Sequence, residues 1–179
     1  MKSAIFKLAL LTLSLASLTF RNAAAAEEMR DTVRAEDYYL EGVRLYCSGE
    51  YPQAESHLSK CLSLDPDNDA AMYYLAMISL SRNEADRAMN LLDKASVLSP
   101  ENPWYSLTMA RLYSTIGEND LATSIYESLI AAHPAKSDYY YELIDLQVRS
   151  GNLTGALETL DSLELLRGSD ELTCNARYE

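Results

Sequence analysis

Small and apolar residues recur along this chain with a fixed period of 34 residues from Ala35 onward. Three columns keep this period with no inserted or deleted residue. They are a turn column (Gly49, Asn83, Gly117 and Gly151), a small-residue column (Ala54, Ala88, Ala122 and Ala156) and a closing column (Pro66, Pro100, Pro134 and Gly168). Such a period predicts an array of four similar units, at 35–68, 69–102, 103–136 and 137–170.

The apolar positions within each unit predict two helices joined by a tight turn. A proline closes most units because it cannot continue a helix, and the polar residues after it suit the start of the next helix. The predicted helices are Ala35–Ser48, Pro52–Leu64, Asp69–Arg82, Ala85–Leu98, Pro103–Ile116, Asn119–Ala132, Ser137–Arg149 and Leu153–Leu166. Residues 27–34 are expected to form a lead-in linker or one extra turn, and residues 171–179 a short tail or the start of a capping helix.

Small residues are expected where the two helices of a unit cross, because a large side chain there would push the backbones apart. The first-helix positions at the crossing are Gly42, Ala76, Ala110 and Ile144. Ile144 is large, which predicts either a splayed fourth unit or an array that loosens toward its end. Larger apolar residues are predicted to fill the core: Leu75, Met109, Leu143, Leu58, Leu92, Tyr126 and Leu160.

This helix–turn–helix unit of 34 residues, with small residues at the crossing and a closing proline, resembles the tetratricopeptide repeat (TPR) family. The resemblance implies an all-α fold, a right-handed superhelical solenoid of about four TPR units, whose concave groove binds a protein or peptide. In that family a set of first-helix positions lines the groove. Carried over to this sequence, the partner-binding groove contains Tyr39, Tyr46, Tyr73, Met77, Leu80, Trp104, Leu107, Arg111 and Tyr141.

The groove implied by the resemblance is aromatic and apolar along much of its length. TPR domains that clamp a terminal carboxylate place Lys and Asn at positions that hold Tyr39, Val43, Tyr73 and Met77 here. We therefore expect Tyr73, Met77, Leu80 and Trp104 to form one continuous patch that binds aliphatic or aromatic anchors. The alternative is that these side chains pack on one another and only stiffen the array.

The first 26 residues predict a secretory signal peptide. Lys2 and Lys7 precede an uncharged run from Leu8 to Phe20, and a small-residue stretch follows. A run of 13 residues is short for a membrane-spanning helix, which needs about 20 apolar residues. Cleavage is predicted between Ala24 and Glu27, which implies a periplasmic or extracellular protein without stable membrane insertion.

The chain is acidic, with a net charge of −12. Removal of residues 1–26 would leave 12 basic residues against 27 acidic ones, a charge of −15. This charge disfavours nucleic acid as a partner and favours solubility or a basic partner. An acidic, solvated convex face is the simpler interpretation.

The three cysteines, Cys47, Cys61 and Cys174, are an odd number and do not suggest a disulfide framework. Cys61 shares a column with Ala95, Leu129 and Leu163, which predicts a small buried hydrophobe.

Catalytic and metal-binding motifs are missing from the sequence. His57, predicted to be exposed, and His133 are the only histidines, and neither has a Ser or Cys at a spacing typical of a catalytic triad. There is no zinc motif and no phosphate-binding loop. The sequence thus predicts a non-enzymatic protein without a cofactor or catalytic residues.

The predicted function is an exported TPR scaffold or adaptor. One alternative is a sensor or regulatory module of a longer signalling protein, and another is an accessory subunit of an envelope enzyme or assembly machine. Self-association through the C-terminal edge near Leu157, Leu160 and Leu163 is also expected, because a tail of nine residues covers little apolar surface.

Overall fold

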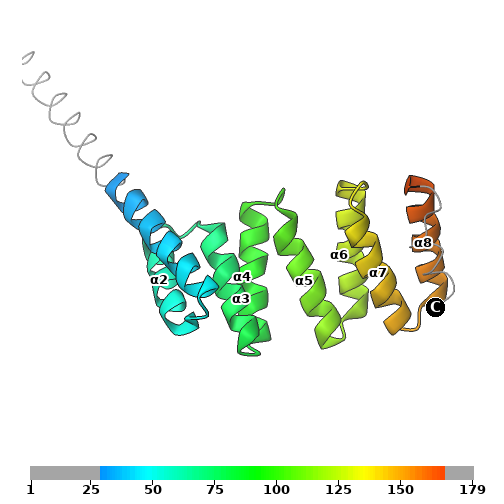
Figure 1. The fold of residues 1–179 in the computed structure, drawn as a ribbon, viewed down its shortest axis with the longest axis horizontal. Coiled ribbons are helices and arrows are strands. Elements are labelled where there is room, and N and C mark those ends of the chain that lie inside the picture. Colours follow the sequence, from blue (N-terminus) through cyan, green and yellow to red (C-terminus); the bar gives the residue numbers. More distant parts are fainter. Residues whose placement is uncertain (1–28, 168–179) are drawn as a thin grey trace, which may run out of the picture. The chain divides into compact units, whose positions relative to one another are not determined.

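The computed structural model of the chain describes residues 29–167. These residues form helices joined by short turns, with no strand among them (Figure 1). A helix over residues 29–47 is followed by α2 (Tyr51–Leu64), α3 (Asp69–Ser81), α4 (Ala85–Leu98), α5 (Pro103–Ile116), α6 (Asn119–Ala132), α7 (Ser137–Arg149) and α8 (Leu153–Arg167). The fold is an all-α helical repeat solenoid, which confirms the predicted fold class.

The helix ends follow the sequence pattern closely. The bounds of α4 to α7 are those predicted, and α2, α3 and α8 differ by one residue at one end. The first helix differs more, since residues 29–34 continue it toward the N-terminus by more than one turn. The predicted signal peptide and the tail at 171–179 lie outside the described residues.

The turn column explains how each unit reverses direction between its two helices. Gly49, Gly117 and Gly151 have φ of 78°, 87° and 80°, and Asn83 has φ of 61°. Glycine adopts this left-handed conformation without a steric penalty, and asparagine tolerates it better than most residues. The recurrence of glycine or asparagine every 34 residues therefore reflects the need for a positive φ at each turn.

The chain divides into two compact units, Met1–Ile78 and Ser79–Glu179, with the division inside α3. In the first unit the 29–47 helix approaches α2 closely at Gly42. A Cβ atom at Gly42 would lie 2.7 Å from Cγ of Leu58, which is itself buried. The small residue predicted at this crossing is therefore needed because a larger one would clash with Leu58.

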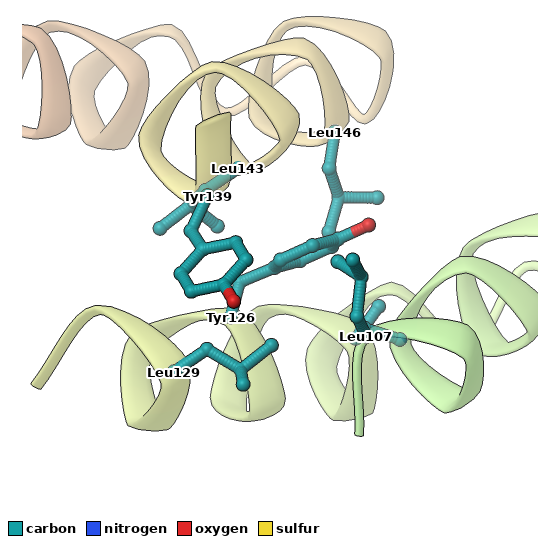
Figure 2. Close-up of a cluster of buried hydrophobic side chains, with 8 residues drawn as sticks. Leu107, Tyr126, Leu129, Tyr139, Leu143 and Leu146 are labelled. Carbon is teal, nitrogen blue, oxygen red and sulfur yellow. The ribbon is translucent and has the colours of Figure 1, made fainter. Parts of the chain in front are cut away.

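The second unit contains α4 to α8, and α5 to α8 lie side by side in chain order (Figure 1). Its core is a cluster of buried side chains contributed by α5, α6 and α7. Figure 2 shows the larger members, Leu107, Tyr126, Leu129, Tyr139, Leu143 and Leu146. The close packing of aliphatic and aromatic groups gives this unit its hydrophobic stabilisation.

The predicted core columns are largely confirmed. The second-helix column Leu58, Leu92, Tyr126 and Leu160 is buried throughout, as are Leu75 and Leu143, whereas Met109 is only half-buried. The alanines of the small-residue column are also buried. Ile144 is half-buried, whereas Ala76 and Ala110, at the same place in their units, are fully buried.

Candidate functional site

Five tyrosines of the first unit form a connected group, which we call the tyrosine cluster. Its members are Tyr39 and Tyr46 on the 29–47 helix, Tyr51 at the start of α2, and Tyr73 and Tyr74 on α3. Tyr74 is the centre of the cluster. Its ring centroid lies 5.2 Å from that of Tyr46, 5.6 Å from that of Tyr73 and 6.2 Å from that of Tyr39.

The positions of these tyrosines along the helices explain the cluster. Tyr39 and Tyr46 are seven residues apart, about two helical turns, so both side chains leave the same side of the helix. Tyr51 follows the Gly49 turn, and its ring lies 5.5 Å from that of Tyr46. The Tyr74 contacts with Tyr46 and Tyr73 are edge-to-face, the arrangement that the charge distribution of aromatic rings favours.

Three phenols of the tyrosine cluster have a raised pKa. Burial is the main cause that raises the pKa of Tyr39, Tyr46 and Tyr74, and neighbouring phenols add to it. The negative charge of Asp69 also raises the pKa of Tyr39. All five side chains retain partial exposure, and that of Tyr51 reaches 37%. The cluster is therefore an aromatic surface that solvent can reach.

The second unit carries a polar network in place of such a cluster. Nε of Arg111 on α5 donates a 3.2 Å hydrogen bond to Oε1 of Glu142 on α7, and Nη2 of Arg111 donates to the same oxygen. The phenol of Tyr126 on α6 donates a 3.0 Å hydrogen bond to Oε2 of Glu142. Burial raises the pKa of Glu142, but the hydrogen bonds from Arg111 and Tyr126 outweigh burial and lower the pKa overall.

A second arginine of this unit is paired in the same way. Nε of Arg149 donates a 2.8 Å hydrogen bond to Asp145, and its Nη2 donates a 3.2 Å hydrogen bond to Oγ of Ser114. The positive charges of Arg111 and Arg149 are thus each met by a carboxylate. An acidic ligand would have to compete with these carboxylates for the two arginines.

The remaining predicted groove residues have different surroundings. Trp104, at the second position of α5, is 60% exposed. Leu107 is 6% exposed and belongs to the core cluster of the second unit, so it offers little surface to a partner. Tyr141 is half-buried, and its buried hydroxyl has no hydrogen-bond partner among the described residues.

Met77 and Leu80 are half-buried. Tyr73 and Met77 belong to the first unit, whereas Leu80 and Trp104 belong to the second. The continuity of these four side chains stays a prediction.

Two residues that organise these surfaces, Tyr74 and Glu142, are not among the predicted site residues. Tyr74 has a signal in the sequence, because it follows the groove tyrosine Tyr73 directly and could reach a neighbouring helix. Glu142 has none, because its partners Arg111 and Tyr126 lie 31 and 16 residues away.

Within residues 29–167 the cysteines and histidines do not gather into a reactive centre, and Cys174 lies outside these residues. Cys61 is buried as predicted, and burial raises its pKa to about 11, whereas Cys47 is exposed. The prediction of an exposed His57 is wrong: this side chain is half-buried, with its ring 5.8 Å from that of Tyr38. Among residues 29–167 no three His, Cys, Asp or Glu side chains come together as metal ligands.

None of the helices in the described part of the chain combines the length and apolar character needed to cross a bilayer.

Three family models described as tetratricopeptide repeat match the chain, at residues 20–68, 45–112 and 107–170. Their boundaries overlap, so together they follow the array from end to end. The resemblance read from the columns is therefore supported independently by the family models.

Two relatives match parts of the chain. Cellulose synthase operon protein C of Xanthomonas axonopodis pv. citri is 32% identical over 84 residues, which are 47% of this chain and 6% of that protein. The TPR repeat-containing protein YpiA of Bacillus subtilis is 21% identical over 153 residues, which are 82% of this chain and 36% of that protein. This chain thus spans only a small part of either relative.

Solved structures of MamA have a similar fold. One MamA crystal structure has a TM-score of 0.66 at 22% identity and covers 72% of this chain and 75% of the MamA chain. A MamA structure from Desulfovibrio magneticus RS-1 has a TM-score of 0.66 at 20% identity and covers 76% and 77% of the two chains. At these identities the likeness concerns the fold alone.

Proposed function

We propose, from the premise that this chain is a protein of the tetratricopeptide repeat family, that it is a protein-interaction scaffold that binds a segment of a partner on its first-helix surfaces. Helical repeat arrays present extended concave surfaces, and these commonly bind proteins. The proposal includes the finer expectation that aliphatic or aromatic side chains of the partner serve as anchors.

The observation that carries the proposal is the exposure of Trp104. A tryptophan that is 60% exposed leaves a large apolar ring in water, although the same helix buries Leu107 in the core. Tryptophan is among the residues most enriched at the energetic centre of protein interfaces. Its place at a predicted groove position links this exposure to partner binding.

The test is capture of partners from an envelope extract by the purified mature chain, with identification by mass spectrometry. Trp104→Ala is expected to weaken capture of the same partner by about 1 to 3 kcal/mol while helicity is retained. Leu121→Ala is the matched control, because Leu121 is exposed on α6, outside the predicted groove. Equal capture by the parent and Trp104→Ala would contradict the proposal.

Export belongs to the proposal as well. It is supported by the basic start, the uncharged run and the small-residue stretch within residues 1–26. The mass of the protein purified from the envelope tests it, since cleavage between Ala24 and Glu27 removes a defined segment. Retention of residues 1–20 in that form would replace export with an anchor.

A second candidate function is that of an accessory subunit of an envelope enzyme or assembly machine. It is favoured by the 32% identity over 84 residues to a protein whose name assigns it to a cellulose synthase operon. The capture experiment distinguishes the two, because an accessory subunit would bring down several components of one assembly in fixed ratio.

A further inference from the structure

The tyrosine cluster of the first unit has a feature that apolar anchors alone do not explain: its aromatic surface lies within an acidic part of the chain. Residues 29–78 contain nine acidic and four basic residues. Two of the basic residues are already paired within the 29–47 helix, Arg34 with Asp31 and Arg44 with Glu41. The excess negative charge of this unit is therefore not met by its own arginines.

Negative charge also lies close to the rings themselves. Asp69 begins α3, and its carboxylate acts on the phenol of Tyr39. Aromatic rings carry negative potential on their faces, and a nearby carboxylate adds to it. A cation at the cluster would therefore be attracted by the negative potential of the rings and also by the negative charge of Asp69.

We propose that the tyrosine cluster binds arginine side chains of a basic segment of the partner protein. The guanidinium groups stack on the phenol rings near Asp69. This inference rests on the proposed scaffold function and specifies the chemistry of one of its surfaces. Arginine fits better than lysine, because its planar and weakly hydrated guanidinium stacks on aromatic faces, whereas the ammonium of lysine is compact and strongly hydrated.

The connected geometry of the rings supports this occupant. Tyr46, Tyr74 and Tyr39 follow one another at centroid distances of 5.2 and 6.2 Å, so ring surface continues from the 29–47 helix to α3. A segment crossing this surface can place successive side chains on successive rings.

Direct binding of labelled peptides to the mature chain tests the inference. The probes are fluorescein-labelled decapeptides of glycine and serine with two leucines and three guest positions. These positions hold arginine, lysine or norleucine in otherwise identical peptides. Fluorescence polarisation is read at about 0.15 M and about 0.5 M salt, because high salt screens unspecific attraction to an acidic protein.

The arginine peptide is expected to bind more tightly than the norleucine peptide by about 2- to 5-fold for each guest position, and more tightly than the lysine peptide. Tyr74→Leu and Tyr46→Leu are expected to remove this advantage. The matched control is Tyr38→Leu, since Tyr38 lies on the same helix as Tyr46 but contacts His57 outside the cluster. Circular dichroism of each variant checks that helicity is retained. If Tyr74→Leu fails to fold, Tyr46→Leu still tests the inference.

Three results would overturn the inference. They are equal binding of the arginine and lysine peptides, an arginine advantage that persists in both cluster variants, and no detectable binding of any peptide. None of them bears on the scaffold function itself, which the capture experiment with Trp104→Ala tests separately.

Discussion

The phenol of Tyr126 on α6 donates a 3.0 Å hydrogen bond to Oε2 of Glu142 on α7. Tyr126 is 2% exposed, and the other oxygen of Glu142 accepts from Arg111 on α5. One carboxylate therefore joins three consecutive helices of the second unit. The hydrogen bond from Tyr126 is the more buried part of this network, whereas Arg111 lies at the surface.

Tyr126→Phe is expected to lower the free energy of unfolding by about 1 kcal/mol, because the ring still packs but the buried hydrogen bond is lost. Glu142→Gln is expected to cost less, since the amide oxygen can still accept from Tyr126 and an exposed ion pair contributes about 1 kcal/mol at most. Urea denaturation of the two variants provides the comparison. A larger loss for Glu142→Gln would show that the pairing with Arg111 dominates.

The contribution of the Glu142 charge is expected to depend on pH. Because the pKa of Glu142 is lowered in the folded chain, its stabilising effect is present above the unfolded value of about 4.3 and is lost as pH falls through the folded pKa. The difference in unfolding free energy between the parent and Glu142→Gln should therefore shrink below about pH 4. Glu127→Gln, at an exposed glutamate of α6, is the control. A difference that grows on acidification would contradict the prediction.

Gly42→Ala tests the close approach of the 29–47 helix to α2. Alanine favours a helix by about 1 kcal/mol over glycine. Its Cβ, however, would lie 2.7 Å from Cγ of the buried Leu58, and overpacking typically costs about 1 to 3 kcal/mol. We expect Gly42→Ala to lower the free energy of unfolding in the parent. In the Leu58→Ala variant, where the smaller side chain leaves room for the added Cβ, we expect Gly42→Ala to raise it. Denaturation midpoints of the double-mutant cycle measure this coupling, and additive effects would show that the two residues do not compete for space.

Ala88→Leu tests the repeat register in the second unit. Ala88 is fully buried on α4, so a larger side chain is expected to cost about 1 to 3 kcal/mol. Asn90→Leu adds a side chain of the same size at an exposed position of the same helix and should cost far less. Equal denaturation midpoints for the two variants would place Ala88 outside the core.

Of the three leucines predicted to support self-association through α8, only Leu157 lies at the surface. Leu160 and Leu163 are buried, whereas Leu157 is exposed together with Leu153, four residues before it, and Leu165, eight residues after it. Such an exposed apolar stripe favours association. Light scattering should show a mean mass that rises with concentration in the parent. Replacing both Leu153 and Leu157 with serine should reduce this rise, and Leu121→Ser should not. A monomeric parent at all concentrations would rule this out.

The fold could be predicted from the sequence because its period fixes local backbone geometry. A residue that must adopt positive φ, such as Gly117, recurs at the same place in every unit, and a proline such as Pro100 marks the end of a helix. The burial of Leu92 and Tyr126 follows from the same argument, because helical periodicity assigns each residue to a face.

The candidate surfaces could not be predicted without the tertiary structure, because the sequence period does not determine the position of the polar or aromatic end of a long side chain. Sequence position assigned Leu107 to the groove and His57 to solvent, yet packing buries the first and half-buries the second. The sequence alone determined the helices, the turns and the acidic charge. Only the tertiary structure brought Tyr74 to Tyr46 and Glu142 to Arg111, because contacts across helices depend on how neighbouring helices pack and on the rotamers that packing allows.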